Sequence, residues 1–181
     1  MNFTRNTINL NRVVVTGIGV ISPVGKTAAE SWENIKNGKS GISKITRFDT
    51  TEFNTKIAAE VKDYDPLTYF DRKEARKIDP YIQYALIAAE EAVKDSKLNL
   101  EKLNKERVGV YIGSGIGGIS TIEDNKKMLL ERGPRRVSPF FLPASLANLA
   151  TGQVSIRFGF RGPNFANVTA CAASTHSIGD S

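Results

Sequence analysis

Two kinds of hydrophobic pattern alternate along the chain and predict strands that alternate with helices. Continuous apolar runs are typical of strands buried on both faces, and they occur at residues 12–18, 108–112 and 165–168, with a shorter candidate at 57–61. Apolar residues at helical spacing, or runs of small residues, favour helices at 80–97, 119–130, 143–158 and 172–178. This alternation predicts an α/β layered fold with a largely parallel sheet.

Polar residues mark where several of these helices begin. Thr27 with Glu30 forms one capping box, and Asp71 with Glu74 forms another. The pair Asp79-Pro80 combines an N-cap side chain with a proline that suits the first helical turn. We therefore expect helices to begin at these three points.

Composition sets the broad class of the protein. The chain has 181 residues, of which 40% are hydrophobic, and this is enough for a core. Its single cysteine excludes an internal disulfide framework, so we expect a reducing compartment. No segment resembles a signal peptide or a membrane span, which favours a cytoplasmic protein. The net charge of +6 suggests a basic face or an acidic partner.

Charge is distributed unevenly along the chain. Beyond position 137 the only charged residues, counting histidine, are Arg157, Arg161, His176 and Asp180. A segment so poor in charge is expected to be buried in a core or in a subunit interface. The sequence stops at Ser181, barely two turns into the predicted last helix, and an uncapped helix of that length is an unusual end. We therefore expect this chain to be the N-terminal piece of a larger protein.

The only cysteine and the only histidine of the chain lie together at 167–176. Cys171 follows one predicted strand and directly precedes a predicted helix. At such a junction the backbone N–H groups and the helix dipole favour an anion, and they can hold the oxyanion of a thioester under attack. The alternative is that Cys171 is a small hydrophobic residue of the core. The segment by itself leaves both interpretations open.

His176 is not placed to activate the thiol. It follows Cys171 by five positions, and on a helix this is a rotation of about 140°, so the two side chains diverge. Thiol–imidazole catalysis needs hydrogen-bond reach, and we therefore expect a structural role for His176. One cysteine and one histidine at this spacing are too few ligands to predict a metal site, and nothing else in the sequence predicts a cofactor.

A glycine-rich loop at 113–118 follows one predicted strand and precedes a helix. Its sequence, GSGIGG, satisfies the dinucleotide pattern Gly-x-Gly-x-x-Gly. That pattern also requires a second strand that ends in an acidic residue, and no predicted strand precedes the candidate, Glu131. A tight turn beside a buried site is the favoured interpretation, because glycines let another segment approach closely.

Basic residues form two clusters, one at Arg72, Lys73, Arg76 and Lys77 and one at Arg132, Arg135 and Arg136. If the first segment is helical, Lys73, Arg76 and Lys77 share one face. A solvated charged face is the ordinary explanation of such clusters. Nucleic-acid binding is disfavoured because no aromatic platform or known reading motif accompanies the charges. A docking patch for an acidic carrier fits better.

Five ordered motifs resemble a known family. They are residues 12–25 (RVVVTGIGVISPVG), 113–118 (GSGIGG), 133–141 (GPRRVSPFF), 161–163 (RGP) and 169–172 (TACA). In this order they resemble the β-ketoacyl-[acyl-carrier-protein] synthases, and within that family the elongating synthase II group. The resemblance implies an acyltransferase with the thiolase fold, whose full form has two similar halves and usually dimerises. Residues 12–181 would be part of the first half, preceded by an extension at 1–11.

The resemblance also implies roles for individual residues. Cys171 matches the nucleophile that accepts the acyl chain from acyl carrier protein, and His176 matches a non-catalytic position. Ile116 matches a position that lines the acyl pocket, and Phe141 matches one that reaches the pocket of the partner subunit. The residues that match the docking site of the acidic acyl carrier protein are Lys73, Arg76, Lys77, Arg135 and Arg136. The resemblance also makes dinucleotide binding by the glycine loop, in the manner of a Rossmann fold, a weaker interpretation.

The implied reaction is decarboxylation of a malonyl group on the carrier, followed by carbon–carbon bond formation on the Cys171 thioester in fatty-acid elongation. The catalytic histidines, the lysine and the phenylalanine gate of the family belong to its second half, which this sequence does not contain. Because the histidines stabilise the developing enolate, we expect this chain alone not to condense. Two alternatives remain. One is a non-catalytic carrier-binding half or split subunit, and the other is a thiolase-fold acyltransferase that uses coenzyme A thioesters.

Overall fold

The computed structural model describes residues 12–181, so the expected extension at 1–11 lies outside the described residues. The strands are β1 (Ile42–Lys44), β2 (Ile57–Ala59), β3 (Val110–Gly113) and β4 (Asn164–Asn167). The α-helices are α1 (Ala28–Lys36), α2 (Arg72–Ala75), α3 (Pro80–Asp95), α4 (Ile119–Arg132), α5 (Phe141–Ser145), α6 (Leu149–Phe158) and α7 (Ala173–Asp180). Four short 3-10 helices are η1 (Pro66–Thr68), η2 (Lys105–Arg107), η3 (Pro134–Arg136) and η4 (Ala170–Ala172).

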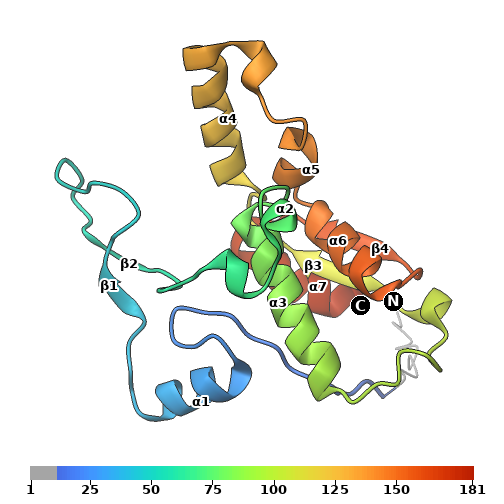
Figure 1. The fold of residues 1–181 in the computed structure, drawn as a ribbon. Helices are drawn as coiled ribbons and strands as arrows, with labels where there is room; N and C mark the ends of the chain where they lie inside the picture. The colour runs from blue at the N-terminus through green and yellow to red at the C-terminus, as the bar shows by residue number, and fades with distance from the viewer. Residues whose placement is uncertain (1–11) are drawn as a thin grey trace, which may run out of the picture.

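The body of the structure is a parallel strand pair covered by helices (Figure 1). In this pair Val110 of β3 lies opposite Asn164 of β4, and the ring of Tyr111 stacks on that of Phe165 with 5.4 Å between centroids. Helices α6 and α7 both pack against these strands, and α3 packs against α6. A parallel pair needs a long crossover, and here the crossover from β3 to β4 contains α4, α5 and α6. The predicted α/β layered fold is therefore confirmed.

The second strand pair was only half predicted. Strand β2 falls inside the expected segment 57–61, whereas β1 has no counterpart among the predicted elements. The two strands are antiparallel, with Ile42 opposite Ala59. They lie apart from the β3–β4 pair in Figure 1, on a separate loop of the chain.

The hydrophobic core lies between α3, α6 and β3. Its two largest fully buried apolar side chains are Ile82 and Leu86, one turn apart on α3, and Ala150 and Val154 of α6 pack with them. Complete burial of an isoleucine or leucine side chain contributes about 1.5–3 kcal/mol. The predicted helix start is confirmed, because the side chain of Asp79 accepts a hydrogen bond from the Tyr81 N–H and caps α3.

The predicted strand at 12–18 is wrong. These residues form no strand, and Val13 and Val15 are 88% and 81% exposed. The end of this segment and the residues after it follow α3 instead, where the N–H groups of Ile18 and Val20 donate to the carboxylates of Asp95 and Glu91. A strand needs a neighbouring strand to accept its hydrogen bonds, and no other strand in the described part of the chain pairs with this segment.

Two predicted helices also have different bounds. The expected helix at 143–158 is two helices, α5 and α6, because tertiary partners bind the carbonyl groups at the break. The Gly118 N–H donates to Ser145 O, and the Tyr81 hydroxyl donates to Leu146 O. Helix α2 ends at Ala75, so Arg76 and Lys77 lie in the turn before α3 and do not share a helical face with Lys73.

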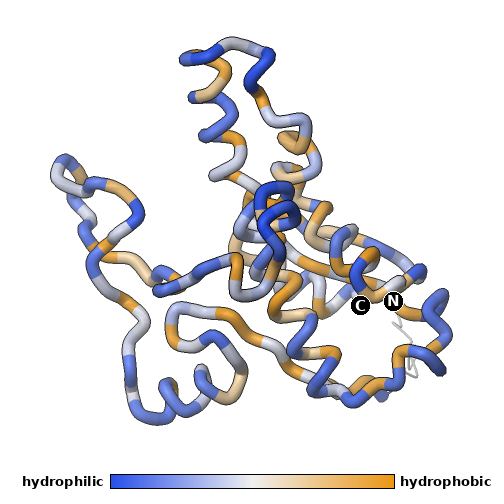
Figure 2. Tube along the Cα trace, viewed as in Figure 1, coloured by the Kyte–Doolittle hydropathy of each residue, from blue (hydrophilic) through white to orange (hydrophobic). Residues whose placement is uncertain are grey.

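Helix α4, η3 and α5 form an excursion that projects from the body (Figure 1). The hydropathy colours of Figure 2 show hydrophobic residues on this excursion as well as in the core. Leu130 at its far end is 75% exposed. The expectation that the charge-poor segment beyond 137 is buried therefore holds only in part: Ala150 and Val154 are buried, but Ile156 and Ile178 are exposed.

Among residues 12–181 no helix is long and apolar enough to cross a membrane.

Candidate active site

Cys171 lies at a sharp turn between a strand and a helix. Strand β4 ends at Asn167, and the chain then passes through η4, which contains Cys171, into α7. Ala170 directly before the cysteine has a φ of 50°, in the left-handed region. This conformation costs an alanine about 1–2 kcal/mol, so the surrounding contacts must impose it. The turn leaves Cys171 as an exposed free thiol, which rules out the core interpretation within this structure.

The turn uses the first N–H groups that follow the thiol. The Ala172 N–H donates to Thr169 O, and the Ala173 N–H donates to Ala170 O. Cys171 thus sits one short turn before the first residue of α7, not inside it. The N–H groups of Ala172 and Ala173 are therefore occupied within the 3-10 turn, and the expectation that backbone N–H groups at this junction hold an oxyanion stays a prediction.

Side chains on both sides of the thiol hold this turn in place. Thr169 Oγ1 lies 2.7 Å from His176 Nδ1, which joins the residue two before Cys171 to the residue five after it. Asn167 Nδ2 donates to Asp180 Oδ2 at 2.9 Å and so joins the end of β4 to the end of α7. The structural role expected for His176 is consistent with this contact. Thr169 was missed by the sequence analysis, although a hydroxyl two positions before a candidate nucleophile is a usable signal.

The glycine loop packs against the same turn. A Cβ on Gly113 would lie 2.3 Å from the backbone carbonyl group of Ala173, and one on Gly118 would lie 2.3 Å from Ala144 O. Gly117 has a φ of 91°. These glycines therefore allow the loop to pass close to α7 and α5, as the close-approach interpretation predicts. Gly115 differs, because its Cβ would meet nothing within 4 Å.

The two predicted acyl-pocket residues lie on different segments, Ile116 in the glycine loop and Phe141 at the start of α5. Ile116, at the tip of the glycine loop, is 65% exposed. Phe141 is half-buried and begins α5. The acyl-pocket role of Ile116 and Phe141 stays a prediction.

The five predicted docking residues are all exposed. Lys73 lies on α2, Arg76 and Lys77 lie in the following turn, and Arg135 and Arg136 lie on η3. Figure 1 places η3 at the far end of α4, well away from α2. The two groups are nevertheless linked through the chain after η3, because Lys77 Nζ lies 5.2 Å from the centroid of the Phe140 ring.

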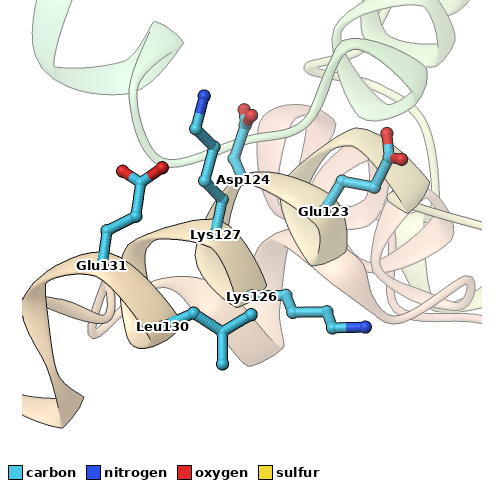
Figure 3. Close-up of a pocket in the computed structure, with 6 residues that line it drawn as sticks. All are labelled: Glu123, Asp124, Lys126, Lys127, Leu130 and Glu131. Atoms are coloured by element: carbon cyan, nitrogen blue, oxygen red, sulfur yellow. The ribbon is translucent and has the colours of Figure 1, made fainter.

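One surface concavity lies away from the thiol. It measures about 540 Å³ and lies along α4, where Glu123, Asp124, Lys126, Lys127, Leu130 and Glu131 line it. Figure 3 shows Asp124, Lys127 and Glu131 extending from one side of this helix, with Lys126 and Leu130 on another. Charges of both signs spaced three or four residues apart are typical of a solvated helix surface. We therefore assign the candidate site to the turn at Cys171 and not to this surface.

A family comparison covers nearly the whole chain. Residues 10–181 match the model of the beta-ketoacyl synthase N-terminal domain. The 3-oxoacyl-[acyl-carrier-protein] synthase 2 of Staphylococcus aureus strain COL is 51% identical over 93% of this chain and 41% of its own length. The enzyme of that name from Coxiella burnetii is 49% identical over 93% of this chain and 41% of its own length. The chain thus spans about two fifths of the length of these relatives.

Solved structures show the same fold. The ishigamide ketosynthase/chain length factor matches with a TM-score of 0.83 and 29% identity, over 92% of this chain and 42% of that one. A type II PKS acyl-carrier protein in complex with its ketosynthase matches with a TM-score of 0.74 and 28% identity, over 92% of this chain and 44% of that one. The architecture around β3, β4 and α7 is therefore that of ketosynthases.

Proposed function

This chain belongs to the beta-ketoacyl synthase family, whose N-terminal domain it matches, and on that premise we propose that it supplies the nucleophile of a 3-oxoacyl-[acyl-carrier-protein] synthase of the synthase II type. The observation that carries the proposal is the exposed thiol of Cys171 at a turn that α7, β4 and the glycine loop hold in place. A fixed, accessible thiol between a strand and a helix suits attack on a thioester carbonyl.

In the proposed reaction the sulfur of Cys171 attacks the acyl thioester of a loaded carrier. The bond from the carbonyl carbon to Cys171 Sγ forms, the bond to the carrier sulfur breaks, and the carrier leaves as a free thiol. A malonyl carrier then loses carbon dioxide, and its carbanion attacks the Cys171 thioester. The new carbon–carbon bond releases Cys171, and the product is a β-ketoacyl carrier. Ile116 and Phe141 are proposed to line the acyl pocket.

The chain contains one histidine, His176, and its Nδ1 is bound to Thr169. Stabilising the enolate that forms on decarboxylation needs donors beyond this residue. We therefore propose that the chain accepts an acyl group but does not condense without histidines from another part of the protein.

The partner proposed for the basic set, namely Lys73, Arg76, Lys77, Arg135 and Arg136, is an acidic acyl carrier protein. Support comes from the exposure of all five residues and from the solved complex of a related ketosynthase with its carrier.

We further propose that the complete protein is a homodimer in the cytoplasm. A dimer would bury apolar residues such as Leu130 and Ile156, which are exposed in the isolated chain.

Intact mass spectrometry tests the proposal. The chain, and the complete reading frame that encodes it, are mixed with acyl-loaded carrier protein, and Cys171→Ser is the matched control. We expect an increase by one acyl group on Cys171 and none on the serine variant. A parallel reaction with acyl-coenzyme A at equal concentration separates a carrier-dependent enzyme from a coenzyme A-dependent acyltransferase.

The outcomes are distinct. An adduct in the complete protein but not in the chain alone would support the family assignment and mean that the remainder of the protein builds the acyl pocket. Acylation by coenzyme A thioesters but not by the carrier would overturn the carrier-dependent function. No adduct on either form would overturn the proposed nucleophile.

A further inference from the structure

A buried glutamine on α3 binds the turn that presents two basic residues. Gln83 is 4% exposed. Its Nε2 donates to the carbonyl oxygens of Ala75 and Ile78, each at 3.1 Å. These two carbonyl groups lie directly before Arg76 and directly after Lys77. One side-chain amide therefore restrains the backbone on both sides of the exposed cationic pair.

The other end of the Gln83 amide is also occupied. The Tyr64 hydroxyl donates to Gln83 Oε1 at 2.6 Å. Burial raises the pKa of the Tyr64 hydroxyl, so this group remains a neutral donor at physiological pH. With its oxygen and its nitrogen both bound, the amide has one favoured orientation. An amide in that orientation directs its N–H groups at the two turn carbonyls, which would otherwise lack partners.

Helix α2, which carries Lys73, is held from a second direction. Arg157 of α6 forms ion pairs with Glu74 of α2 and Glu90 of α3. Its guanidinium also lies 5.8 Å from the centroid of the Phe70 ring. The backbone beneath the basic residues is thus attached to core helices, while their cationic side chains stay exposed.

Such an arrangement matters for binding more than for packing. Ordering a loop on association lowers affinity, and a loop ordered beforehand avoids that loss. We propose that Gln83 is a positioning residue that presets the Arg76–Lys77 turn for docking of the acidic carrier protein. This inference rests on the proposed function, and it assigns to a buried neutral residue part of the affinity of an exposed charged surface.

The test is the dissociation constant of acyl carrier protein, measured by fluorescence anisotropy with the complete protein. Gln83→Met keeps the approximate volume of the side chain and leaves the charge of the protein surface unchanged, but it removes all three hydrogen bonds of the Gln83 amide. We expect it to raise Kd about fivefold, because the docking cations lose their preset positions. Ile87→Val, a mild change at a buried position of the same helix, controls for general loss of stability and is expected to leave Kd unchanged. Tyr64→Phe removes only the hydrogen bond to Gln83 Oε1, so it is expected to raise Kd less than Gln83→Met does.

A readout away from the docking surface completes the test. The alkylation rate of Cys171 by iodoacetamide is expected to be the same in the wild type and in Gln83→Met. If Gln83→Met does not fold, Gln83→Asn decides by the same Kd criterion, because its shorter amide cannot reach both carbonyls. Wild-type Kd in a folded Gln83 variant would overturn the inference while leaving the proposed function intact. A wild-type protein that binds no carrier would overturn both.

Discussion

Thr169 Oγ1 lies 2.7 Å from His176 Nδ1, and this contact closes the turn that presents Cys171. The helical spacing of His176 from the thiol already predicted that it does not act as a base. The structure adds that the imidazole is engaged with a residue on the other side of the nucleophile. This contact supports a backbone in which Ala170 has a left-handed conformation.

Loss of the Thr169 hydroxyl should slow reactions of Cys171. Thr169→Val removes the hydrogen bond to His176, whereas Thr169→Ser retains it. A hydrogen bond contributes about 1 kcal/mol. If this whole amount is lost from the free energy that holds the thiol in its reactive position, the rate of reaction at Cys171 falls roughly fivefold. The measurement is the second-order rate of iodoacetamide alkylation. His176→Ala should match Thr169→Val, and the double variant should be no slower. Equal rates for the valine and serine variants would contradict the positioning role.

Substitution by alanine should destabilise the protein at Gly113 but not at Gly115. The Cβ in Gly113→Ala would lie 2.3 Å from the backbone of Ala173. Overpacking of this kind costs about 1–3 kcal/mol of unfolding free energy. Gly115→Ala is the matched control, because its Cβ meets nothing within 4 Å. Urea denaturation of both variants measures the difference, and equal stability would show that the loop does not pack on α7 as described.

The stability of the protein should depend on the hydrogen bonds between Asp79 and Thr121, which join the start of α3 to the start of α4. The carboxylate is 4% exposed, and its Oδ2 accepts hydrogen bonds from the N–H and the hydroxyl of Thr121. Thr121→Val removes the hydroxyl donor, and we expect a loss of about 1–3 kcal/mol in unfolding free energy, because a buried charged acceptor is left with one bond fewer. Thr121→Ser should retain most of the stability. Thermal denaturation of the two variants distinguishes them.

Tyr81 should make the protein sensitive to alkaline pH. Burial, with a further contribution from the charge of Asp79, raises the pKa of Tyr81 from 10.0 to about 12. Below pH 10 the phenol is protonated in the folded and unfolded states, so its stabilising effect is complete. Between pH 10 and pH 12 the unfolded state loses the proton first, so stability falls as pH rises through this window. The unfolding free energy measured from pH 10 to pH 12 should fall less steeply for Tyr81→Phe than for the wild type. Equal slopes for the two proteins would contradict the raised pKa of Tyr81.

Local pattern was sufficient for several elements. The Asp79-Pro80 start of α3 and the helix that follows β3 were predicted from capping and periodicity, because these signals act within one or two turns. Cys171 was predicted to lie at a strand-to-helix junction for the same reason. The identity of the family also followed from short motifs, each of which is readable in sequence order.

Long-range partners decided the rest. The apolar run at 12–18 has strand character, but its pairing depends on a neighbouring strand, so the run alone could not establish it. The break between α5 and α6 follows from donors on Tyr81 and Gly118 that lie far away in the sequence. The hydrogen bonds of Gln83 were equally hidden, because they reach the turn before α3 only once Tyr64 and that turn are folded around it.

The sequence by itself determined the family and the order of most elements, and it predicted Cys171 as the nucleophile, since these depend on residue types and on spacing along the chain. Only the tertiary structure decided that Cys171 is exposed at a turn with a left-handed alanine, that Thr169 meets His176 across it, and that α2 ends before Arg76. These features depend on contacts between different elements of the fold, such as Thr169 with His176 and Gln83 with Ala75. Local propensities contribute only small free energies, and tertiary contacts of similar or larger size therefore override them.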